Sequence, residues 1–332
     1  MKSLVFAILA SAAGQPSTGP SAIPVRPAHT YSIVALDRTT GELGAAVQSH
    51  WFSVGSLVPW IEAGIGAVCT QSFVEASYGP LGLELMRAGR TAEEALAGLV
   101  RADKNEAVRQ VGMVDARGRA AAHTGSSCIA AAGHHLGDGF ACQANMMLKD
   151  TVWKAMAQAF ETTGGELVDR LLAALEAAEK EGGDIRGRQS AAVVVVRGQP
   201  SGLPWKDRLY DLRVEDHPQP LDELRRLVRL NKAYNHMNAG DDLLTEGKTA
   251  EALKAYALGM EIYPDNPEMV FWPAVTMAAT GRVEDSLPLF RKVFALDPNW
   301  AELLRRLPAA GQFPKDGKLL DRILSLVPKK ER

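Results

Sequence analysis

The feature that most constrains this chain is a repeat of 34 residues in its last third. From about residue 220 onward the apolar residues follow helical spacing, and residues of similar kind recur 34 positions apart. The matched pairs are Gly247 and Gly281, Leu253 and Leu287, Tyr256 and Phe290, Met260 and Phe294, and Pro264 and Pro298. A repeat of this length indicates one pair of helices, and neighbouring pairs must stack to bury their apolar faces. Residues 219–330 are therefore predicted to form an all-α unit.

Two segments of this unit, 239–267 and 274–300, resemble tetratricopeptide (TPR) repeats. Each has a Gly turn, an apolar-aromatic second helix and a closing proline in the expected places. The tail at 301–328 is then a capping helix or a degenerate third repeat. The resemblance implies a surface for a protein partner.

The chain before residue 219 has clusters of strand-like segments with helical segments between them. Thr91 is a candidate N-cap because Glu94 follows three residues later, and residues 190–198 form a continuous apolar run typical of a strand covered on both faces. The other predicted strand segments lie at 30–37, 43–49, 56–64, 65–72, 139–147 and 208–218, with a hairpin around 116–118. Helices are predicted at 78–89 and 91–103, and a long helix is broken near 164–165. This order predicts an α+β domain with sheets packed between helical layers.

Charge and hydropathy exclude several classes of partner. The 332 residues include 37 basic and 39 acidic ones, a formal net charge of −2, so no strong field would attract nucleic acid or an anionic membrane surface. No apolar run is long enough to span a bilayer. We expect a small polar or weakly charged ligand, and a homo-oligomer remains open.

The N-terminal residues resemble a short secretory signal. Lys2 precedes an apolar run from Leu4 to Ala10, and small residues continue to Ala12. We predict a signal peptide at 1–12 and a disordered leader, rich in Pro, Gly and Ser, at 13–29. The mature protein would then be periplasmic or extracellular, whereas a mis-called start would leave it cytoplasmic.

Familiar catalytic and cofactor motifs are missing from the sequence. It has no G-x-S-x-G elbow, no phosphate-binding loop, no dinucleotide fingerprint and no metal-ligand spacing among its histidines and cysteines, so we predict no metal and no cofactor. Cys128 and Cys142 could bridge neighbouring strands, or they and Cys69 could be buried thiols. Nucleophilic catalysis by a terminal residue remains open.

Three polar clusters, at 123–128, 182–191 and 207–218, fall where predicted strands begin or end. In the second cluster Asp184, Arg186 and Arg188 alternate, so on an extended backbone they would point to one face. Arginine offers a planar fork that suits a carboxylate, which makes these residues candidates for substrate binding. The alternative is a structural ion pair.

Four segments, 30–83, 109–128, 182–191 and 211–218, together resemble the DUF1028 family, which is related to N-terminal-nucleophile (Ntn) hydrolases. The resemblance covers roughly residues 30–218 and implies a four-layer αββα sandwich. In related hydrolases the chain starts on a strand with Thr, Ser or Cys, and the terminal amine is the base for that side chain.

By this resemblance Thr30 is the predicted nucleophile of an amidohydrolase for a small peptide or acyl-amino compound. Gln189 and Ser190 are candidate oxyanion donors. Candidate substrate-binding residues are His50, His123, Asp184, Arg186 and Arg188. The sequence departs from proteasome-like hydrolases because it has no Lys or Arg from Thr39 to Met86. The alternative is that Thr30 only opens a strand, since Thr favours strands, and that the protein is a non-catalytic binding or scaffold protein.

Overall fold

The structure is a computed structural model that describes residues 30–328. The predicted signal peptide and leader lie outside these residues. All ten strands of the described part belong to two antiparallel sheets, which confirms a mixed α+β fold. The first sheet has the order β10-β9-β2-β1-β8-β7 and the second has the order β3-β4-β5-β6.

The strands of the first sheet are β1 (Thr30–Leu36), β2 (Leu43–Ser49), β7 (Gly133–Gly137), β8 (Phe140–Ala144), β9 (Ser190–Val196) and β10 (Arg208–Val214). Those of the second are β3 (Pro59–Glu62), β4 (Gly66–Ser72), β5 (Arg109–Asp115) and β6 (Ala120–Thr124).

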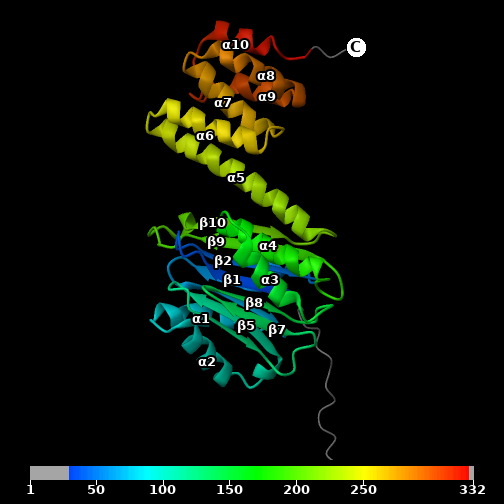
Figure 1. Ribbon diagram of the computed structural model, residues 1–332. Helices are drawn as coiled ribbons and strands as arrows, with labels where there is room; N and C mark the ends of the chain where they lie inside the picture. The colour runs from blue at the N-terminus through cyan, green and yellow to red at the C-terminus, as the bar shows by residue number, and fades with distance from the viewer. Residues whose placement is uncertain (1–29, 329–332) are drawn as a thin grey trace, which may run out of the picture.

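The two sheets pack face to face and helices cover their outer faces (Figure 1). Val34 and Val47 of the first sheet share an apolar cluster with Cys69 and Val114 of the second. Helices α3 (Val152–Thr162) and α4 (Leu167–Lys180) pack on the outer face of the first sheet, and α1 (Tyr78–Arg87) and α2 (Ala92–Ala102) on that of the second. Because β1 and β9 are covered on both sides, all their residues are buried.

Local signals in the sequence correspond to real element boundaries. The Thr91 hydroxyl accepts a hydrogen bond from the Glu94 amide at 3.0 Å, and the Glu94 carboxylate accepts one from the Thr91 amide at 2.9 Å, which confirms the predicted capping box. The predicted break between α3 and α4 is also confirmed, with Gly165 in the left-handed region at φ 99°. Strand β7 was not predicted, because its sequence GHHLG has no apolar alternation and it forms only by pairing with β8.

Helix α5 (Pro220–Thr245) joins the sheets to the helical region (Figure 1). Its first part, with Leu224 and Val228, packs in the core of the first sheet, whereas Ala233 and Met237 belong to a separate core with Tyr256. The boundary between the two hydrophobic cores therefore lies within α5, between Val228 and Ala233.

The remaining helices are α6 (Thr249–Ile262), α7 (Pro267–Ala279), α8 (Val283–Leu296), α9 (Asn299–Arg306) and α10 (Gly317–Leu324). Gly247, between α5 and α6, and Gly281, between α7 and α8, have φ of 76° and 88°. Both turns therefore need a residue that tolerates the left-handed region, which explains why glycine recurs at this spacing. None of the helices described is both long and apolar enough to cross a membrane.

Candidate functional site

Three hydroxyl side chains lie in one row across the first sheet. Thr30 pairs with Ser49 across β1 and β2, and Ser49 pairs with Ser190 across β2 and β9. Residues directly opposite each other in an antiparallel sheet point to the same face. All three are fully buried, and the Thr30 hydroxyl donates to the Ser49 hydroxyl at 3.2 Å. Three neighbouring strands therefore place Thr30, Ser49 and Ser190, here called the hydroxyl row, on one side of the sheet.

The hydroxyl row faces the second sheet. Along β1, Tyr31 and Ile33 pack with the helices that cover the outer face, whereas Val34 and Leu36 pack between the sheets. Since side chains alternate along a strand, Thr30 shares the inner face with Ser32 and Val34. The space between the sheets is thus apolar toward the end of β1 and polar toward its start.

A network of buried amide side chains holds the backbone of Thr30. Gln71 Nε2 donates to the Thr30 carbonyl at 2.9 Å and to Gln110 Oε1 at 2.7 Å. The Thr30 carbonyl also accepts from the Asn145 amide at 3.2 Å, and the Asn145 side chain donates to Gln110 Oε1 at 2.8 Å. Ser32 donates to Gln71 Oε1 at 2.6 Å. These residues, here called the amide network, fix the start of β1 with uncharged groups, each of them fully buried.

Ser190 and Gln189, the two predicted oxyanion donors, lie in different environments. The Ser190 hydroxyl accepts from the Val54 amide at 3.1 Å and donates to the Trp51 carbonyl. The Gln189 side chain is half-buried and donates to Asp216 at 3.2 Å. Ser190 therefore belongs to the hydroxyl row, whereas the Gln189 amide is engaged by a carboxylate of the loop after β10.

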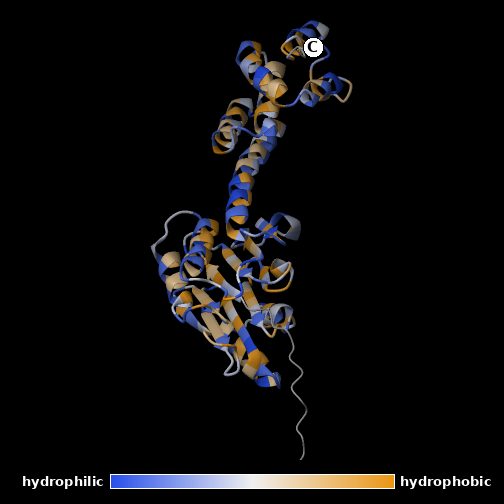
Figure 2. Cartoon of the chain, turned by 90° about the vertical axis from the view of Figure 1, so that its right-hand side faces the viewer, coloured by the Kyte–Doolittle hydropathy of each residue, from blue (hydrophilic) through white to orange (hydrophobic). Residues whose placement is uncertain are grey.

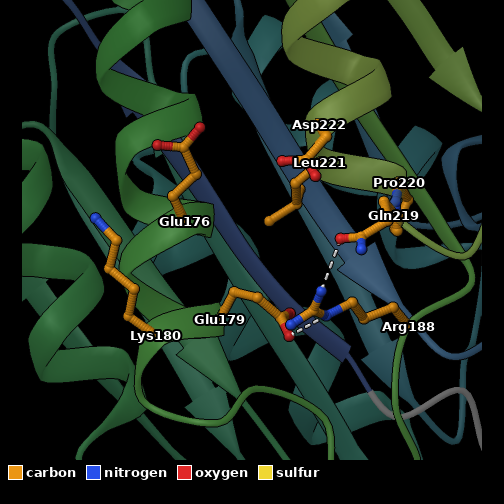
Figure 3. A pocket seen from close by; sticks show the side chains of 8 residues that line it. All are labelled: Glu176, Glu179, Lys180, Arg188, Gln219, Pro220, Leu221 and Asp222. Carbon is orange, nitrogen blue, oxygen red and sulfur yellow. Dashed lines mark hydrogen bonds and ion pairs between the residues drawn. The ribbon is translucent and has the colours of Figure 1, made fainter.

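The three charged residues of the 184–188 segment do not share one face, because the backbone turns. The Gly187 amide donates to the Asp184 carbonyl at 2.9 Å, and Gly187 has φ of 108°. Arg186 forms an ion pair with Asp184 at 2.7 Å, while Arg188 Nε donates to Glu179 at 2.5 Å (Figure 3). The expectation of one extended polar face was wrong.

Asp184 acts as a structural centre for the loops next to the hydroxyl row. Its fully buried side chain accepts from the His50 amide at 3.2 Å and from the Arg186 amide at 2.9 Å. The His50 ring lies 3.3 Å from the Arg188 carbonyl. Asp184 thus ties the loop after β2 to the loop before β9.

His123 lies on the other side of the second sheet. Ala121 and His123 share a face of β6, and Ala121 packs with α1 and α2. The His123 ring lies 2.9 Å from the Glu106 carbonyl and 3.1 Å from its carboxylate. It therefore faces away from the hydroxyl row.

Exposed apolar side chains surround the end of the first sheet where Thr30 lies. Phe52, Ile129, Leu148 and Ile185 are 64%, 39%, 56% and 59% exposed, and we call them the apolar rim. The Met146 amide donates to the Ile129 carbonyl at 3.0 Å, and the Ile185 amide donates to the Met146 carbonyl at 3.2 Å. Since the neighbouring Asn145 amide binds the Thr30 carbonyl, the rim is anchored beside the start of β1.

Comparison with known families identifies the sheet domain. The model of the DUF1028 family, a family of unknown function, matches residues 30–224. The chain belongs to the DUF1028 family. A crystal structure of a DUF1028 protein from Silicibacter pomeroyi is similar to this chain, with 31% sequence identity and a TM-score of 0.55. The similar region covers 60% of this chain and 88% of the Silicibacter pomeroyi chain. No match was found among functionally curated proteins.

In this DUF1028 domain the amide network is the feature that sequence reasoning missed. Gln71 is the second-last residue of β4 and Gln110 the second residue of β5, in the motifs CTQS and RQVG. Gln143, the second-last residue of β8 in the motif CQAN, also joins the network by donating to Ser32 at 3.2 Å. Glutamine at repeated strand ends was a usable signal, because a buried amide must find partners. The sequence could not show which face each amide takes, since these strands are buried on both sides.

Cys69, Cys128 and Cys142 are free thiols. Within residues 30–328 no three His, Cys, Asp or Glu side chains gather into a potential metal site.

Proposed function

We propose that the DUF1028 domain is an Ntn-type amidohydrolase in which Thr30 is the nucleophile, acting on a small peptide or acyl-amino substrate. The order of helix pair, sheet, sheet and helix pair supports an Ntn-like αββα sandwich. The observation that carries the proposal is the place of Thr30: it is the first residue of a central strand, and its hydroxyl faces the polar end of the space between the sheets.

The chemistry requires a free amine on Thr30. An α-amino group titrates at about 7.7 to 8.0, so it can take the Thr30 hydroxyl proton near neutral pH. The hydroxyl oxygen then bonds to the substrate carbonyl carbon and the carbonyl electron pair moves onto its oxygen. When that pair returns, the C–N bond breaks, and the ammonium gives its proton to the leaving amine. Water, deprotonated by the same amine, hydrolyses the acyl ester and restores Thr30.

The residues around Thr30 suit this sequence of steps. Ser49 is within hydrogen-bonding distance of the Thr30 hydroxyl, and Gln71 holds the Thr30 carbonyl, so uncharged side chains orient the nucleophile. The terminal amine then serves as the base. The apolar rim would contact the non-polar part of the substrate, whose burial contributes to binding.

The chain must be cut between His29 and Thr30, because an amide nitrogen has a delocalised lone pair and cannot accept the proton. Cleavage of the proposed signal peptide after Ala12 would leave a leader, so a second cut is required.

The test uses recombinant protein trimmed to begin at Thr30 and measures amine release from dipeptides and N-acyl amino acids. We expect release by the trimmed wild type and by Thr30→Ser at a lower rate. Trimmed Thr30→Ala should be inactive, because the nucleophile is lost, and so should the untrimmed chain. Equal rates for trimmed wild type and trimmed Thr30→Ala would refute the proposal.

A second candidate is a non-catalytic binding protein in which the helical region docks a protein partner. Helices α5 to α8 support a TPR-like module, since Ala252 and Ser286 are both fully buried at equivalent positions of α6 and α8. A cavity of about 250 Å³ in this region, lined by Asp241, Trp272 and Thr276 among others, could hold a side chain of a partner. A trimmed protein without amide hydrolysis would favour this candidate.

A further inference from the structure

A pocket of about 440 Å³ lies between α4 and the start of α5 (Figure 3). Its lining comes from α4, from the loop before β9, and from the segments just before and at the start of α5. The residues are Glu176, Glu179, Lys180, Arg188, Gln219, Pro220, Leu221 and Asp222. The volume is at the lower end of the range for small-molecule sites, roughly 300 to 1,000 Å³, and suits a ligand of amino-acid or dipeptide size.

This pocket is on the opposite face of the first sheet from the hydroxyl row. Tyr31, which follows Thr30, points toward α4 and donates to Glu179 at 2.7 Å. Burial, together with the neighbouring Glu179 carboxylate, raises the pKa of Tyr31 well above its ordinary value. Its hydroxyl therefore stays a neutral donor and keeps Glu179 in place. The pocket is a second site, separate from the space around the Thr30 hydroxyl.

Part of the lining is already neutralised within the protein. Glu179 pairs with Arg188, Arg188 Nη1 donates to Gln219 at 3.0 Å, and Glu176 pairs with Arg225 at 2.5 Å. By contrast, no hydrogen bond or ion pair within residues 30–328 engages the side chain of Lys180 or of Asp222. The pocket thus offers one unpaired cation and one unpaired carboxylate.

The charges are also separated in space. Glu179 lies against Arg188, and of the two unpaired groups the Lys180 ammonium lies on the α4 side of the pocket and Asp222 on the α5 side (Figure 3). With Arg225 counted beside Glu176, the lining has as many positive as negative groups. A ligand with a net charge would leave one of the two unpaired groups without an opposite charge, whereas a zwitterion pairs with both.

We propose that this pocket binds a small zwitterion of the amino-acid or dipeptide class. The ligand carboxylate lies against Lys180, the unpaired cation of the lining. The ligand ammonium lies against Asp222, the unpaired carboxylate, and an apolar side chain packs on Pro220 and Leu221.

Isothermal titration of the full chain with L-leucine and glycyl-L-leucine tests this proposal. At least one of the two should bind, and removing either charge should weaken that binding more than tenfold. The matched probes are the N-acetyl derivative, which lacks the ammonium, and the carboxamide, which lacks the carboxylate. Absence of binding by both zwitterions, or equal binding of the modified probes, would overturn the proposal.

Two substitutions locate the binding site. Asp222→Asn should weaken zwitterion binding more than tenfold, while the matched change Asp242→Asn, at an exposed position of the same helix, should have no effect. Thr30→Ala should bind as the wild type does, because the pocket does not depend on the proposed catalysis. Unchanged affinity in Asp222→Asn would exclude this pocket as the binding site.

Discussion

At the scale of single residues, the candidate site is defined by hydrogen bonds rather than by charge. The carbonyl of Thr30 accepts from Gln71 and from the Asn145 amide, and Gln71 in turn joins Ser32 and Gln110. A buried polar group that loses its partner costs more than an average hydrogen bond contributes. The amide network therefore stabilises the domain only while all its members are present.

The amide network predicts a large effect for Gln71→Leu. The substitution removes the acceptor of the Ser32 hydroxyl and one of the two donors to the Thr30 carbonyl, so we expect the free energy of unfolding to fall by about 3 kcal/mol. Chemical denaturation would measure this loss. The control is Gln158→Leu, an exposed position on α3, which should change stability by less than about 0.5 kcal/mol. A loss at Gln71 no larger than at Gln158 would contradict the network.

The three thiols predict a graded reactivity. Burial raises the pKa of Cys69 to about 12, and it raises the pKa of Cys142 well above its usual range. The half-buried Cys128 has a raised pKa for the same reason, but reagent can reach it. Since the thiolate is the reactive form, iodoacetamide at pH 8 should add slowly to Cys128 alone in the native protein and to all three cysteines after unfolding.

Intact mass with and without denaturant would count these adducts. A Cys128–Cys142 bridge, which the sequence left open, would permit only one adduct in the unfolded, unreduced protein.

At the scale of elements, sequence patterns predicted the structure wherever a local rule decides it. The capping box at Thr91, the break at Gly165 and the fully buried strand β9 each depend on residues close in the chain. Strand β7 and the direction of Arg188 depend on distant partners, namely β8 and Glu179. The same reason explains why Thr30 could be proposed from the sequence while the amide network around it could not.

The helical repeat makes its own prediction at this scale. Ala252 is fully buried in α6, where Ser286 is fully buried in α8. Ala252→Trp should overpack the array and lower its stability by about 1 to 3 kcal/mol. Thermal unfolding followed by the helical circular dichroism signal should show the helical region melting earlier than the sheets. Lys254→Trp, at an exposed position of α6, is the matched control, and equal melting of the two variants would argue against the repeat packing.

At the scale of the whole molecule, α5 belongs to both halves. Its first residues complete the core of the first sheet and line the α4–α5 pocket, and its later residues pack in the first core of the helical region. Figure 2 shows hydrophilic residues along the part of α5 between the two. A single helix thus connects the DUF1028 domain, the proposed zwitterion pocket and the surface proposed for a protein partner.

The central claim, that Thr30 is an N-terminal nucleophile, is tested most directly by the start of the mature chain. Protein recovered from its native source, and not from an untreated recombinant preparation, should contain a species that begins Thr-Tyr-Ser-Ile, because only a cut before Thr30 frees the amine that serves as base. Intact mass with N-terminal sequencing gives this result. A mature chain that begins only at Ala13 or at Met1, with no fraction starting at Thr30, would contradict the mechanism.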